Sequence, residues 1–126
     1  MTLERRDIRK LNVNQLVQAA SNVLDFLEEV DEFPGLYGGA VLRNALRRYE
    51  LFWLPLAAKQ GKEIRRLAAP LDIAWVWHVH MLKPQNYEED CLNTVSHVID
   101  HAPMNRYQRK EGLQRARYVW ETYYPQ

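Results

Sequence analysis

The stretch Pro70–Cys91, PLDIAWVWHVHMLKPQNYEEDC, constrains the fold of this chain more than any other. Its first half is apolar on nearly every side, and a helix of that kind lies buried at the centre of a domain. His78 and His80 interrupt the apolar run, and Pro84 ends it. A strand is the alternative, because the tryptophans alternate with other residues. The length of about twelve residues and Pro70 at the start favour a helix.

Apolar residues recur at helical spacing in four further segments. The expected helices cover approximately residues 13–30, 39–59, 70–82, 84–100 and 106–123. Pro55 predicts a kink or an early stop in the second of these. The sequence therefore predicts an all-α fold, a compact bundle of about five helices around a central buried helical hairpin. We expect residues 1–126 to form a single domain, with residues 1–12 as a charged arm.

Composition narrows the class of protein. The 126 residues include 17 basic and 16 acidic side chains, a net charge of +1 that makes nucleic acid an unlikely partner. A single cysteine excludes an internal disulfide and fits a reducing, cytoplasmic location. No stretch is apolar enough for a signal peptide or a membrane span. The best candidate for a local basic patch consists of Arg106, Arg109, Lys110, Arg115 and Arg117.

The short connection before Pro84 predicts an antiparallel hairpin, in which facing positions sum to about 167. This register brings His80 near Tyr87, and it brings His78 near Asp90 or Cys91. Residues two apart on a helix point about 200° apart, so the two histidines cannot hold one metal ion unless the segment is extended. A buried imidazole needs partners for both nitrogens, which predicts a structural polar network at the hairpin.

Three more specific functions remain as alternatives to a purely structural network. The ligand types suit zinc or iron, and the candidate metal ligands are His78, His80, Asp90 and Cys91. His97 and His101 also have the i, i+4 spacing of a helical metal pair. Cys91 with a histidine base has the residue types of a nucleophilic site. A small-molecule pocket between the second, third and fourth helices is a further alternative.

The same stretch resembles the signature of the glycine-rich domain-containing protein-like (GRDP-like) family, a domain of unknown function. The signature positions are Asp72, Trp77, His78, His80, Leu82, Pro84, Tyr87, Asp90 and Cys91. Weaker similarity includes Arg48-Tyr49 before the motif and Trp120 with Tyr124-Pro125 after it. The resemblance implies a soluble helical domain without an established catalytic activity, which precedes further regions in larger relatives.

The most economical functional hypothesis is therefore an interaction or regulatory module with a protein partner. In this hypothesis, the binding or structural motif comprises Asp72, Trp77, His78, His80, Tyr87, Asp90 and Cys91. Metal-dependent chemistry and small-molecule binding are the two alternatives.

Overall fold

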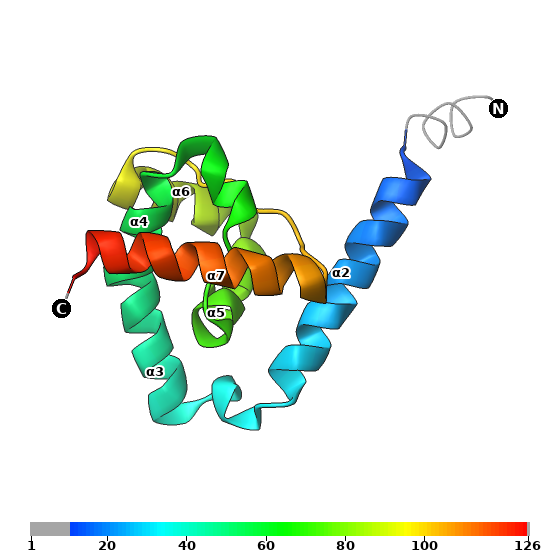
Figure 1. Cartoon of the computed structure of the whole chain (residues 1–126), viewed down its shortest axis with the longest axis horizontal. Coiled ribbons are helices and arrows are strands. Elements are labelled where there is room, and N and C mark those ends of the chain that lie inside the picture. Colours follow the sequence, from blue (N-terminus) through cyan, green and yellow to red (C-terminus); the bar gives the residue numbers. More distant parts are fainter. Residues whose placement is uncertain (1–10, 126) are drawn as a thin grey trace.

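The computed structural model describes residues 11–125, so most of the expected charged arm lies outside the described residues (Figure 1). All regular elements of this part of the chain are helical, which confirms the all-α fold. None of its helices is long and apolar enough to cross a membrane. The elements are, in order, α2 (Val13–Asp31), η1 (Pro34–Tyr37), α3 (Gly39–Arg48), η2 (Tyr49–Trp53), α4 (Leu54–Ala58), η3 (Gly61–Arg66), α5 (Leu71–Met81), α6 (Pro84–Val95) and α7 (Arg106–Tyr123).

Most expected helix limits are close to those observed, with one clear exception. α7 covers the expected residues, and the Asn12 side chain caps α2 by accepting a hydrogen bond from the amide of Gln15 at 3.1 Å. α6, expected to reach residue 100, ends at Val95. Ser96 there has a φ of 74°, a left-handed conformation that terminates a helix. The remaining residues of the expected helix form a loop that leads to α7.

The second expected helix is continuous but changes its winding at η2. Here the chain forms a π-helical turn, in which the amide of Leu54 donates to the carbonyl of Tyr49 five residues earlier. Pro55 follows directly and has no amide to donate. Its ring would also crowd the carbonyl four residues before it, and the wider turn relieves that contact. The irregularity predicted at Pro55 is therefore present just before it.

The core forms around α5, which contacts α2, α3, η2 and α6. Trp53 and Trp77 are 0% and 1% exposed, and their rings meet edge to face at 5.5 Å between centroids. Ile73 on α5 is also fully buried. α5 is thus the central, buried helix that its all-round apolar sequence predicted.

α2 leaves the body of the molecule at an angle, with its N-terminal half projecting outward (Figure 1). Asn22, Phe26 and Val30 form its buried side. The sequence pattern had placed Leu24 and Leu27 on the apolar face with other small and aliphatic residues. Both are exposed, because the side of α2 that meets the body is centred on Phe26 instead.

Glycine is unfavourable inside a helix, but Gly112 in α7 allows the helix to pack closely against the backbone at Ala68. A β-carbon at this position would lie 2.9 Å from the backbone nitrogen of Ala68. We expect Gly112→Ala to destabilise the protein, although alanine favours the helix by about 1 kcal/mol. The clash should cost about 1–3 kcal/mol, which outweighs that gain.

Urea unfolding measures the effect of Gly112→Ala, with Gln114→Ala on the exposed side of α7 as the matched control. The control should be neutral or slightly stabilising. A Gly112→Ala protein as stable as the wild type would show that the loop at Ala68 yields without cost.

Candidate functional site

α5 and α6 form the expected hairpin. α5 ends at Met81 and α6 begins at Pro84, so only Leu82 and Lys83 connect them. The amide of Tyr87 donates to the carbonyl of Lys83 at 2.8 Å, which closes the first turn of α6. The hairpin thereby brings His80 of α5 and Asp90 of α6 together beside Tyr49 of η2.

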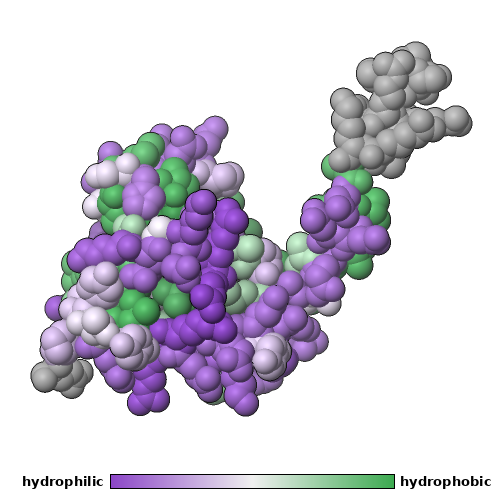
Figure 2. Space-filling view, turned by 45° about the horizontal axis from the view of Figure 1, so that its top comes forward, coloured by the Kyte–Doolittle hydropathy of each residue, from purple (hydrophilic) through white to green (hydrophobic). Residues whose placement is uncertain are grey.

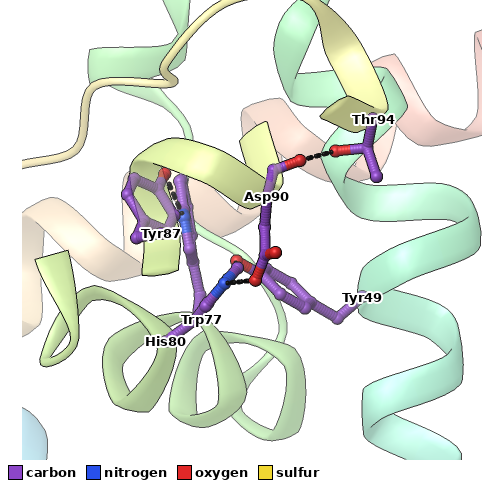
Figure 3. A network of polar contacts seen from close by, with 6 residues as sticks. All are labelled: Tyr49, Trp77, His80, Tyr87, Asp90 and Thr94. Atoms are coloured by element: carbon purple, nitrogen blue, oxygen red, sulfur yellow. Dashed lines mark hydrogen bonds and ion pairs between the residues drawn. The ribbon is translucent and has the colours of Figure 1, made fainter. Parts of the chain in front are cut away.

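His80 joins three helical segments through its two ring nitrogens (Figure 3). Nε2 lies 2.7 Å from Oδ2 of Asp90 on α6, and Nδ1 lies 2.7 Å from the hydroxyl of Tyr49 in η2. A carboxylate only accepts, so Nε2 donates to Asp90, and the tautomer with its proton on Nε2 accepts the Tyr49 hydroxyl at Nδ1. Tyr49 is 4% exposed, and burial, with nearby negative charge, raises its pKa above the ordinary 10. The hydroxyl therefore stays protonated and remains a donor.

A second chain of hydrogen bonds runs through Tyr87. The indole Nε1 of Trp77 donates to the Tyr87 hydroxyl at 3.0 Å (Figure 3). This hydroxyl donates in turn to the carbonyl of Ile99 at 2.7 Å. Burial is the main cause that raises the pKa of Tyr87. The contact fixes the loop after α6 against the hairpin, although Ile99 had been expected within a helix.

The predicted register of the hairpin is right in outline and wrong in its partners. The His80 and Tyr87 rings do meet, edge to face with 5.0 Å between centroids. However, Asp90 pairs with His80 and not with His78. The His78 ring turns to the other side of α5, where it lies 5.4 Å from the ring of Phe26 on α2.

Asp72 connects the start of α5 to the end of α3. Its Oδ2 lies 2.5 Å from Nη1 of Arg48, and its Oδ1 accepts the amide of Ile73 at 2.9 Å. An acidic side chain in the first turn also suits the positive end of the helix dipole, as the sequence predicted. The pair is partly exposed, with side chains 33% and 23% accessible.

Cys91 is a free thiol with no exposed surface. It packs in the core beneath the hairpin, with buried Tyr49 and Tyr87 near it. Both nitrogens of His80 are engaged elsewhere, so that ring does not serve as its base. In this arrangement, Cys91 is a small core side chain.

The candidate metal ligands are not brought together. Of His78, His80, Asp90 and Cys91, only His80 and Asp90 are in polar contact, and His78 faces away. Between residues 11 and 125, no three His, Cys, Asp or Glu side chains form a group that could hold a metal ion. The residues present therefore do not fit the zinc or iron site that their types suggested. His97 and His101 also fail as a helical pair, because α6 ends before them.

His101 is the residue whose place the sequence misjudged most. It had been expected on a helix with His97, but it stacks on Trp77 with 4.1 Å between ring centroids and lines the same cavity as His78. Burial lowers the pKa of His101 to about 4, and it also lowers the pKa of His78. His101 reaches this position because α6 ends at Val95, and the spacing of apolar residues did not predict that end.

Two of the arginines of α7 are paired with acidic side chains on α2. Arg109 is buried and its Nη2 lies 2.5 Å from Oε2 of Glu29 on α2. Arg106 lies within 4 Å of three carboxylates, those of Glu28 and Glu29 on α2 and that of Glu32 directly after it. These ion pairs therefore join α7 to the C-terminal part of α2.

Comparison with known proteins agrees with the signature. The family model "Glycine-rich domain-containing protein-like" (GRDP-like) matches residues 3–90. Glycine-rich domain-containing protein 2 of Arabidopsis thaliana is 34% identical over 129 residues, and glycine-rich domain-containing protein 1 of the same organism is 32% identical over 128. Each alignment covers 98% of this chain, which spans 16% of the length of either relative. No solved structure matches the chain.

The Tyr49–His80 contact is testable with a pair of tyrosine substitutions. We expect Tyr49→Phe to reduce the free energy of unfolding by about 1–3 kcal/mol, because Nδ1 of His80 loses its partner in a largely buried site. Tyr118→Phe is the matched control, since Tyr118 is 74% exposed. A double-mutant cycle with His80→Phe should give a coupling of about 0.5–3 kcal/mol. Additive effects would mean that the contact contributes nothing to stability.

The low pKa of His101 predicts an acid-sensitive component of stability. The unfolded chain binds a proton near pH 6.5, but the folded protein does so only near pH 4. Stability should therefore be complete above pH 6.5 and should fall as the pH drops from there toward 4. Urea unfolding of the wild type between these values should show about 2 kcal/mol more loss than His101→Phe does. His97→Gln, at an exposed position, should retain the full loss. Parallel curves for wild type and His101→Phe would contradict the assignment.

Proposed function

The chain belongs to the glycine-rich domain-containing protein-like family, and we propose that this domain is a protein-interaction module that pairs through α2 with a second copy of itself. The observation that carries the proposal is a second apolar stripe on α2, on the side that faces away from the body. The hairpin network of α5 and α6 serves as the scaffold that holds α2 in position.

The stripe has the spacing of a helix-pairing seam. Its members are separated alternately by four and three residues, the pattern that places side chains along one line of an α-helix. They are Val13, Val17, Ala20, Leu24 and Leu27. All five are exposed, with Val17 and Leu24 at 63% and 62%. Figure 2 shows hydrophobic surface on the part of α2 that projects from the body.

The stripe is separate from the contact that holds α2 to the body. Phe26 and Val30 point inward and pack with Leu36 against Leu71, Ala74 and Trp75. At about 100° per residue, this inward side is more than a third of a turn away from the stripe. An exposed row of aliphatic side chains does not stabilise a monomer, and a contiguous apolar patch of this kind marks an interaction surface.

A second copy is the occupant that the flanking residues favour. Asn14 and Ser21 lie beside the stripe and carry no charge, so two identical helices meet there without like-charge repulsion. Glu28, at the C-terminal end, is the nearest acidic flank. The seam covers only two heptads. The area that it can bury is therefore smaller than the roughly 1,200–2,000 Å² of a standard protein–protein interface. We therefore expect a dissociation constant in the micromolar range, about 1–100 μM.

The single free cysteine suits a reducing location, and we place the protein in the cytoplasm on that ground. Salt bridges to α2 offset the charges of Arg106 and Arg109 on α7. Because fewer basic side chains are then free to bind phosphates, we favour a protein partner over nucleic acid. Because the chain spans 16% of either Arabidopsis relative, pairing through α2 is proposed for this domain alone.

Sedimentation equilibrium tests the pairing directly. We expect the wild type to shift from monomer to dimer between about 1 and 500 μM, and Leu24→Glu to remain monomeric, because it places two charges in the seam. The melting temperature of Leu24→Glu should match that of the dilute wild type, since surface changes shift stability by about 0.5 kcal/mol or less.

Gln15→Glu is the matched control, because it adds a charge at another exposed position of α2 that lies off the stripe. It should dimerise as the wild type does. A wild type that stays monomeric at about 500 μM would overturn the proposal, as would a dimer that Leu24→Glu leaves intact.

A further inference from the structure

A cavity of about 200 Å³ lies where α2, α5, α7 and the loop before α7 meet. Aromatic and thioether side chains form part of its lining, namely Phe26, Trp77, Met81 and Met104. The cavity is separate from the solvent-facing stripe of α2. It is also separate from the His80 network, which lies on the other side of α5.

The imidazoles of His78 and His101 complete the lining, and each has a ring nitrogen without a hydrogen-bond partner among the described residues. The Nδ1 of His101 is buried with no hydrogen-bond partner. Among the described residues, no hydrogen bond reaches the ring of His78 either, in contrast to the fully bonded His80. His78 is thus the one signature histidine without a structural partner. An unsatisfied buried nitrogen destabilises a fold unless something else bonds it.

The electrostatics of the cavity favour a neutral ligand. Burial keeps both imidazoles uncharged at neutral pH, so each presents one acceptor and one N–H donor. Arg109 also lines the cavity, but its charge is balanced by Glu29 at 2.5 Å. The site therefore offers hydrogen bonds without a net field that would select an anion.

Size and lining together define the chemical class of the occupant. A cavity of about 150 Å³ in another protein accommodates benzene, so about 200 Å³ suits one or two fused rings. Phe26 and Trp77 supply ring contacts, and the methionines supply adaptable sulfur contacts. We propose that this cavity binds a small, planar, neutral aromatic molecule whose hydroxyl or N–H group bonds to His78 and His101.

The methionines make the binding directly observable. The chain has three, and Met81 and Met104 both line the cavity. NMR spectra of the full chain with ¹³C-labelled methionine methyl groups would be recorded during titrations with phenol and with toluene. We expect phenol to shift both cavity methyl signals and to bind at least about fivefold more tightly than toluene, which lacks the hydroxyl. Met81→Leu assigns the signals.

Substitution of the histidines tests whether their ring nitrogens recognise the ligand or whether the ligand only fills the apolar space. His78→Phe and His101→Phe retain an aromatic ring but remove its nitrogens, so each should weaken phenol binding about tenfold and leave toluene binding little changed. His97→Phe, at an exposed position beyond the cavity, is the control and should bind as the wild type does.

The wild-type titrations alone can overturn the proposal, even if a variant fails to fold. Equal affinity for phenol and toluene would show that the imidazoles do not select the ligand. An absence of methyl shifts up to the solubility limit of both probes would show that water or protein fills the cavity. Loss of phenol binding in His97→Phe would place the site elsewhere.

Discussion

The fold depends on one imidazole that has no free nitrogen. His80 sits on the central helix α5, and its two hydrogen bonds reach Tyr49 in η2 and Asp90 in α6. The first bond joins segments 31 residues apart and the second holds the two helices of the hairpin together, and a partly buried imidazole favours a single arrangement in which both are made. Trp77 and Tyr87 repeat the principle one turn away. The signature is therefore largely a device for orienting helices, and His78 stands out because it takes no part in it.

Helical periodicity was enough to predict the all-α class, the limits of α7 and the central place of α5, because each depends on local spacing. The network at His80 was predictable only in part. A hairpin register pairs positions along one line, whereas crossed helices let side chains reach diagonally, so Asp90 met His80 instead of His78. The contact of Tyr49 was not predicted because it depends on the packing of η2 against α5, which no local pattern encodes. His101 escaped because Ser96 ends α6 early.

α2 illustrates a different limit of sequence analysis. Periodicity finds apolar residues on a helix but does not say which of two apolar sides meets the core. Leu24 and Phe26 are only two positions apart, yet one is exposed and the other is buried. The same turns of α2 therefore border both the proposed partner surface and the wall of the cavity at Phe26. The two proposed binding surfaces thus lie on different sides of one helix.

The π-helical turn at Tyr49–Trp53 makes the length of this segment as important as its composition. Tyr49 must point at His80, and Trp53 must reach Trp77, from a single continuous helix. Removing one residue between them would restore a regular α-helix but rotate one side chain by about 100° relative to the other. Only one of the two contacts would then survive. A substitution inside the turn leaves this spacing unchanged, whereas a deletion of one residue changes which helix face each aromatic side chain occupies.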